Sequence, residues 1–192
     1  MMKRLADIAV VQTGFPFREK VVPDPEGTLA VIQMKDIDDS AGLQLDGCTM
    51  INYNDKRYSK HLLNVGDVVI QSRGSKFPAA TIDKTILAIA ALGLMVIHPE
   101  GISPEYLAWV LNQGRTREAL RSVSQGTYVP FISRAALEAL QIPVPAMEVQ
   151  QKLVSIAHLR RREEQLSTQL IALKNQYIDA QVWKAAASKT RS

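Results

Sequence analysis

Short apolar runs alternate with polar turns over the first three quarters of the chain. Residues 29–34 have the pattern of a buried strand ended by an acidic turn at 36–39, and a glycine–aspartate turn precedes a second strand at 68–70. The apolar run 85–97 predicts one or two further buried strands, although its alanine-rich middle also permits a helix. Both interpretations place this run in the core of a body built from short elements.

Helix start signals follow these strands. A serine, a proline and a glutamate at 103–105 supply a capping side chain, a proline at the first helical position and an acid near the positive helix end, so we expect a helix to about residue 112. A second helical stretch is predicted at 115–123, and Ser133 is expected to cap a short helix at 134–140. Short strands interspersed with short helices predict an α+β fold.

The last quarter of the chain has the pattern of one long helix that begins near Gln150 and Gln151. Its apolar residues recur at spacings of four and three, as in the seam of a coiled coil. The predicted seam residues are Leu153, Ile156, Leu166, Leu170, Leu173 and Tyr177. A charged run at 160–164 divides the seam into two blocks. The helix cannot bury such a seam by itself.

Either the chain's own body or a second long helix could cover this seam. The helix would extend for about 50 Å, which exceeds the diameter expected for a body of this size. Pairing with a second helix, from this chain or another, is therefore favoured. The predicted organisation is a body at 1–147, a long helix at 148–187 for dimerisation and partner docking, and a frayed tail at 188–192.

Composition narrows the function classes only slightly. The 192 residues carry a net charge of +4 and a pI of about 9.2, which suits a polyanionic partner without requiring one. The single cysteine, Cys48, excludes an internal disulfide framework and a cysteine cluster for zinc. Asp7 interrupts any signal-peptide core, and the most apolar window is too short to span a bilayer, so we expect a cytoplasmic protein.

Catalytic motifs are not found in the sequence. It has no glycine-rich phosphate loop, no Gly-x-Ser-x-Gly elbow, no methyltransferase Asn/Asp-Pro-Pro-aromatic motif and no acid two residues before a lysine. Its three histidines, His61, His98 and His158, lack the spacing of metal ligands. We therefore predict no catalytic residue, no metal site and no cofactor in this chain, while an enzyme with an unrecognised site stays open as a third hypothesis.

A series of short segments runs along nearly the whole chain. The segments are Leu5-Ala6-Asp7-Ile8-Ala9, Gly14-Phe15-Pro16-Phe17, Ile32-Gln33-Met34-Lys35-Asp36-Ile37, Gly66-Asp67-Val68-Val69-Ile70, Pro104-Glu105-Tyr106-Leu107, Gln125-Gly126-Thr127, Ile142-Pro143-Val144-Pro145, and Gln150 or Gln151 leading into the long helix. In this order and spacing, the series resembles the specificity subunit of type I restriction–modification systems. Each segment alone is a weak signal.

The resemblance implies a partner set and an architecture. Members of that family carry two target-recognition domains, each reading half of a bipartite DNA site, and two long antiparallel helices that dock methyltransferase subunits. A restriction subunit, an ATP-driven translocase and nuclease, joins that core. S-adenosylmethionine, ATP and magnesium would then belong to these partners and not to this chain.

This chain departs from the family pattern because it has one predicted recognition domain and one helix. A homodimer with antiparallel helices would restore the missing half, and its two-fold symmetry predicts a palindromic bipartite target. Pairing with a different half-subunit, or an inactive fragment, is the alternative. An orphan half-subunit acting as a protein–protein adaptor or decoy, without reading DNA sequence, is the competing function.

Candidate DNA-contacting residues come from chemistry, because the family's base contacts lie in variable loops. Phosphates require cations, and base edges require forked donors or amides. The candidates are Arg73, Ser75 and Lys76 in one basic loop, Lys56, Arg57, Tyr58 and Lys60 in a second cluster, Arg18 and Lys20 after an aromatic loop, and Gln125, Thr127 and Tyr128 in a polar turn. Each set could equally be a solvated surface loop. Phe15 and Phe17 are interpreted as core residues or loop anchors rather than base wedges. Arg160–Arg162 are interpreted as solvated charges or as contacts to phosphate or the methyltransferase.

Overall fold

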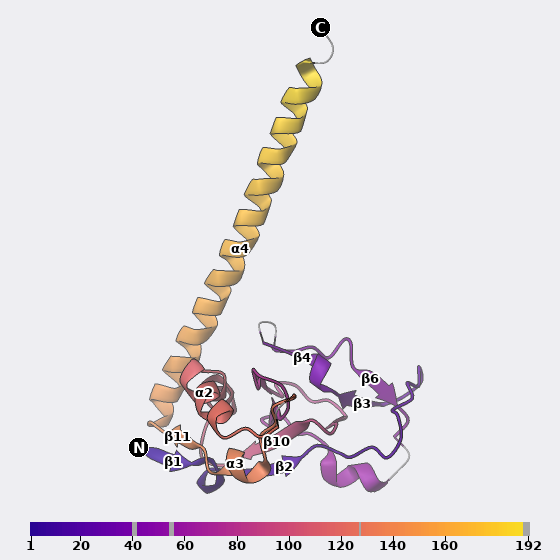
Figure 1. Ribbon diagram of the computed structural model, residues 1–192, viewed down its shortest axis with the longest axis vertical. Coiled ribbons are helices and arrows are strands. Elements are labelled where there is room, and N and C mark those ends of the chain that lie inside the picture. Colours follow the sequence, from indigo (N-terminus) through magenta and orange to yellow (C-terminus); the bar gives the residue numbers. More distant parts are fainter. Residues whose placement is uncertain (40–41, 54–55, 127, 190–192) are drawn as a thin grey trace. The chain divides into compact units, whose positions relative to one another are not determined.

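The computed structural model describes residues 1–39, 42–53, 56–126 and 128–189. The chain divides into two compact units, Met1–Gln151 and a second one from Lys152 onward. We call the first unit the body and the second the helix unit, and describe each separately. The body contains strands and short helices, and the helix unit continues one long helix, so the predicted α+β fold is confirmed (Figure 1).

Two sheets form the centre of the body. The larger one is antiparallel, with strand order β2-β10-β7-β8. Its strands are β2 (Ala9–Thr13), β7 (Val68–Gln71), β8 (Ala79–Thr81) and β10 (Leu94–Pro99). The smaller sheet has the order β6-β3-β9, with β3 and β9 parallel. Its strands are β3 (Leu29–Ile32), β6 (Thr49–Ile51) and β9 (Ala88–Ala90). The run 85–97 thus forms strands, and the helical alternative for it is wrong.

Two short strand pairs complete the body. The pair β4 (Ile37–Asp38) and β5 (Gly42–Leu43) is antiparallel, so the acidic stretch that we predicted as a turn includes a strand. The strand β1 (Met2–Arg4) pairs antiparallel with β11 (Gln141–Pro143), and the two lie side by side in Figure 1. Pairing of these strands brings the first residues of the chain next to the segment that leads into the long helix.

Short helices fill the connections. They are α1 (Pro104–Leu111), α2 (Gly114–Ser122) and α3 (Arg134–Glu138), with 3₁₀ turns η1 (Leu5–Asp7), η2 (Met34–Asp36) and η3 (Lys56–His61). Ser103 and Ser133 cap α1 and α3, since each hydroxyl accepts a backbone N–H three residues on. Both predicted caps are confirmed.

The core of the body is apolar and includes two clusters that pack on the sheets. One cluster packs Ile32, Val69, Ile82 and Val96 from both sheets. The other packs Leu29, Ile51 and Ile89 from the smaller sheet against an aromatic group. The loops that carry the candidate DNA-contacting residues connect strands and helices that pack on this core.

The long helix α4 (Met147–Lys189) begins in the body and continues through the helix unit. Its first turn is held by Gln150, only 1% exposed, whose amide oxygen accepts from the Ser103 N–H at 2.9 Å and whose amide nitrogen donates to the Pro145 carbonyl at 2.9 Å. These bonds explain why the first turn belongs to the body. Ser188 and Lys189 are still helical, so the tail predicted from residue 188 begins too early, and 190–192 lie outside the described residues.

Candidate nucleic-acid interface

The basic loop 72–76, which we call the Arg73 loop, connects the paired strands β7 and β8. Gly74 has φ +99°, a left-handed conformation that a side chain would strain. The buried Phe77 directly follows the loop and anchors that end in the core. At the other end, the hydroxyl of the buried Ser72 donates to the Gly93 carbonyl at 2.9 Å. The core therefore fixes the loop at both ends and leaves Arg73, Ser75 and Lys76 exposed.

The polar turn that was predicted separately lies against this loop. The Gly74 N–H donates to the Pro130 carbonyl at 2.8 Å, and the Ile132 N–H donates to the Ser72 carbonyl at 2.9 Å. Arg73 and Phe131 form an antiparallel bridge. Gln125 and Tyr128 are exposed, whereas Thr127 lies outside the described residues. Two candidate sets that are about fifty residues apart in sequence thus form one surface.

Lys76 is not a free cation in this surface. Its Nζ lies 3.6 Å from Asp39 Oδ2, and the guanidinium of Arg117 donates to the other oxygen of the same carboxylate. The hydrogen bond from Arg117, with the charges of Arg117 and Lys76, holds the pKa of Asp39 below its ordinary value despite partial burial. Arg73, by contrast, has no ion pair with any residue that the structure describes.

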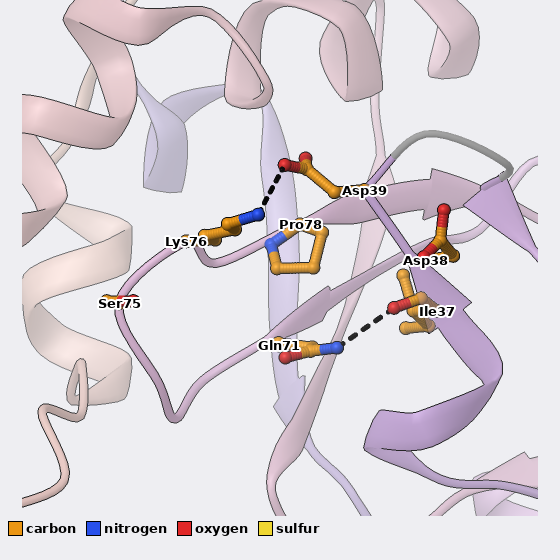
Figure 2. Close-up of a pocket in the computed structure, with 7 residues that line it drawn as sticks. All are labelled: Ile37, Asp38, Asp39, Gln71, Ser75, Lys76 and Pro78. Atoms are coloured by element: carbon orange, nitrogen blue, oxygen red, sulfur yellow. Dashed lines mark hydrogen bonds and ion pairs between the residues drawn. The ribbon is translucent and has the colours of Figure 1, made fainter.

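A pocket of about 290 Å³ opens beside the Arg73 loop. Its lining residues are Ile37, Asp38, Asp39, Gln71, Ser75, Lys76 and Pro78. Figure 2 shows Lys76 turned toward Asp39 and the Gln71 amide turned toward Ile37, whose carbonyl it reaches at 3.0 Å. Sequence reasoning missed Asp39 and Arg117, because their 78-residue separation gives no local signal.

The second basic cluster lies on η3, where Lys56, Arg57 and Lys60 are exposed. Tyr58 was predicted to contact DNA, and this prediction is wrong. Its ring is buried in the smaller-sheet cluster and is unavailable for reading DNA. It packs edge-on against Phe15 at 5.1 Å, and Phe15 in turn contacts Phe17 at 4.9 Å.

These aromatic contacts bring two predicted sets together. Arg18 and Lys20, both exposed, directly follow Phe17, and Arg57 directly precedes Tyr58 with its guanidinium 5.7 Å from the ring centre. Phe15 and Phe17 act as the loop anchors that the sequence indicated.

Most of the predicted seam residues of α4 are exposed to solvent. Ile156, Leu166, Leu170, Leu173 and Tyr177 are exposed, and Leu153 is half-buried. Leu159, which sequence reasoning missed, is 71% exposed. It lies three residues after Ile156 and seven before Leu166, so Ile156, Leu159 and Leu166 share one coiled-coil register.

A second apolar ridge was also missed. Ile171, Ile178 and Val182 are exposed and follow one another at spacings of seven and four. At 3.6 residues per turn they lie about a third of a turn from the seam. The apolar arc of the helix is therefore wider than the narrow seam predicted.

Two of the histidines contact the same glutamine. His98 Nδ1 lies 2.7 Å from Asp67 Oδ1 and its Nε2 lies 3.4 Å from the Gln12 amide oxygen, while His61 Nδ1 lies 2.9 Å from the Gln12 amide nitrogen. Among the described residues, no group of three or more His, Cys, Asp or Glu side chains is arranged to hold a metal ion. Within the same residues, no helix is long and apolar enough to cross a membrane.

Three solved structures with this fold come from chains that are longer than this one. The type I restriction-modification S subunit from M. genitalium has 13% identity and a TM-score of 0.58 over 88% of this chain and 41% of its own. The HsdS subunit from Thermoanaerobacter tengcongensis has 18% identity and a TM-score of 0.60 over 88% and 38%. A third, from a study of complex assembly and conformational transition of the type I R-M system, has 18% identity and a TM-score of 0.57 over 88% and 39%.

The chain thus spans about two fifths of the length of the solved structures that it matches. The comparison with curated proteins found no match. A family model described as the type I restriction modification DNA specificity domain matches residues 1–174, which include the whole body and the first part of α4. The chain therefore belongs to the family of type I restriction–modification DNA specificity domains.

Proposed function

We propose that this chain is the sequence-specific DNA recognition subunit of a type I restriction–modification complex. The observation that carries the proposal is the joining of the Arg73 loop to the turn at Gln125 and Tyr128 by backbone hydrogen bonds. This joint surface presents Arg73, which forms no ion pair with the residues that the structure describes, together with the Gln125 amide and the Tyr128 ring. Cations position a protein on phosphates, and amides or guanidinium groups read base edges.

The chemistry of the complex would reside in partner subunits. We infer that a DNA adenine methyltransferase subunit and a translocase–nuclease subunit carry S-adenosylmethionine, ATP and magnesium, while this chain supplies recognition and a scaffold. The two apolar ridges on α4 support a scaffold role, because each can contact a different partner. We assign the seam to a second α4 and the ridge of Ile171, Ile178 and Val182 to the methyltransferase.

The competing function is an adaptor or decoy half-subunit that does not read DNA. The ion pair between Lys76 and Asp39 favours it, because an engaged lysine binds phosphate less readily. Purification of the tagged chain from its native cells tests the scaffold role. Stoichiometric recovery of an adenine methyltransferase is expected, and recovery of the chain alone would favour an orphan.

DNA binding is tested directly with Arg73→Ala/Lys76→Ala. Each lost phosphate contact reduces the slope of log affinity against log salt by roughly 0.9, so we expect weaker binding and a slope smaller by about 1 to 2. The matched control is Lys84→Ala/Lys174→Ala, which removes two exposed charges outside both loops. Equal binding by the double variant and the control would reject this loop as the contact.

We further propose that two copies pair through antiparallel α4 helices and read a palindromic bipartite site. A cysteine scan along the seam from Ile156 to Tyr177 tests the orientation. In an antiparallel homodimer only positions near the two-fold axis face their own copy, whereas in a parallel one every seam position does. Self-cross-linking is expected in one narrow window.

The native cysteine will interfere little with this scan. Burial raises the pKa of the Cys48 thiol to about 11, with a smaller contribution from the nearby Asp36 carboxylate, so the thiol stays protonated near neutral pH. Cross-links at every seam position would show a parallel dimer, and none at any position would show that the seam has another partner.

A further inference from the structure

Gln125 and Phe131 close a hairpin whose described tip residues, Tyr128 and Val129, are exposed. The backbone N–H of Gln125 donates to the Phe131 carbonyl and that of Phe131 donates to the Gln125 carbonyl, both at 2.8 Å. Gly126 has φ +94°, and a Cβ there would lie 2.8 Å from the Val129 carbonyl oxygen. The tight turn therefore requires glycine, and its geometry is set by the backbone.

The base of this hairpin is fixed to the body. It is bonded to the Arg73 loop through Pro130 and Ile132, and the Ile132 side chain is buried. The tip, in contrast, has Tyr128 99% exposed and Val129 58% exposed. An aromatic ring is thus held away from the body on a support that its neighbours define.

The surroundings of Tyr128 identify the kind of surface that would cover it. On the described part of the hairpin, the other exposed large apolar side chains are Val129 and Phe131. Arg73 bridges to the base of the hairpin, and Ser75 and Gln125 are exposed on the two joined segments. A protein interface centres on a broader apolar patch, whereas an aromatic ring beside a cation and polar donors is the combination that contacts stacked bases and phosphates.

We propose that Tyr128 is a wedge that stacks against a base step of the bound duplex and partly unstacks it, while Arg73 contacts the adjacent phosphate. This inference rests on the proposed DNA-recognition function and gives the hairpin a role within it. Insertion of an apolar side chain kinks DNA at flexible steps, and the sequence dependence of that deformation adds specificity. Tyr128 would then select DNA by how easily it deforms.

The test compares the affinity of the full chain for a fully paired 30-base-pair duplex and for the same duplex with a central T·T mismatch, measured by fluorescence anisotropy. A mismatch lowers the cost of unstacking, so a wedge protein prefers it. We expect the wild-type chain to bind the mismatched duplex about tenfold more tightly. Tyr128→Ala should abolish this preference and weaken binding to the paired duplex by roughly ten- to a hundredfold.

Two variants separate stacking from electrostatics. Tyr128→Phe keeps the ring and should retain the preference. Tyr128→Ala removes no charge and should leave the salt slope unchanged, while Arg73→Ala should lower that slope and keep the mismatch preference.

Several outcomes would overturn the wedge. Equal affinity of the wild-type chain for both duplexes, or a preference that survives in Tyr128→Ala, rejects it while leaving DNA recognition intact. Loss of the methyltransferase from Tyr128→Ala purifications, with DNA binding unchanged, would identify the tip as a protein contact. Absence of binding to either duplex would reject the wedge together with the proposed function.

Discussion

The body and the helix unit use the same kinds of residue in opposite ways. Leu107 in α1 is 0% exposed because the helix packs on the larger sheet, whereas Leu159 in α4 is 71% exposed. The body closes on itself through β1 and β11 and buries its apolar side chains internally. Within the described residues of the helix unit, the apolar arc stays exposed. The body therefore buries a core of its own, whereas the helix unit leaves its arc free for the partner that we propose.

Charges placed in the seam should have the largest effect on the helix unit and should spare the body. Leu170→Glu/Leu173→Glu would put four carboxylates into a dimer interface and remove four buried leucines, each contributing roughly 1.5–3 kcal/mol. We expect complete loss of the dimer at micromolar concentration, measured by sedimentation velocity. Circular dichroism should show reduced helix content, because packing of the apolar face supplies most of the stability of a helix in a protein. The strands of the body should be retained.

The control for this variant carries the same charges away from the seam. Gln165→Glu/Asn175→Glu changes exposed positions that do not belong to the seam pattern, and it should leave the dimer intact. An unchanged mass for the leucine variant would mean that the seam contacts something other than a second copy.

The boundary between the two regions is tested next, at Gln150. Gln150→Ala leaves the half-buried Ser103 N–H and Pro145 carbonyl without this partner, so we expect the free energy of unfolding to fall by about 1–3 kcal/mol. Gln151→Ala is the matched control at an exposed neighbour and should have a much smaller effect. Urea denaturation of both variants measures the difference, and equal losses would contradict the assignment.

The smallest expected effect concerns the charge of the body surface. Asp39→Asn removes the carboxylate that engages Lys76, and an exposed charge pair of this kind contributes about 1 kcal/mol, so DNA affinity should rise by roughly fivefold at most. The control is Asp83→Asn, at an exposed position outside the loop. Unchanged affinity in Asp39→Asn would mean that Lys76 does not contact DNA.

The same carboxylate gives a pH dependence. The pKa of Asp39 in the folded protein is below its ordinary value of 3.8, chiefly because of the hydrogen bond from Arg117. The folded state therefore gains stability from this group at pH values above 3.8 and loses it as the pH falls through the lower folded pKa. In acid, thermal melts of wild type and Asp39→Asn should converge.

Local patterns predicted the elements well. Ser103 and Ser133 signalled helix starts because capping is a contact within four residues, and the strands around Ile32 and Val69 followed from continuous apolar runs. Tyr58 misled the prediction, because an aromatic inside a basic run has the same pattern whether it faces solvent or core. Burial of its ring depends on Phe15, 43 residues earlier in the chain.

The sequence by itself determined the α+β class, the long helix and its seam, because capping and periodic burial are properties of neighbouring residues. It left open whether Gln150 or Gln151 mattered, and it treated the Arg73 loop and the turn at Tyr128 as separate candidates. Only the tertiary structure decided these points, by directing Gln150 to the Ser103 N–H and by joining the two loops through backbone hydrogen bonds. Such contacts link residues far apart along the chain, and their partners are fixed only when the sheets pack.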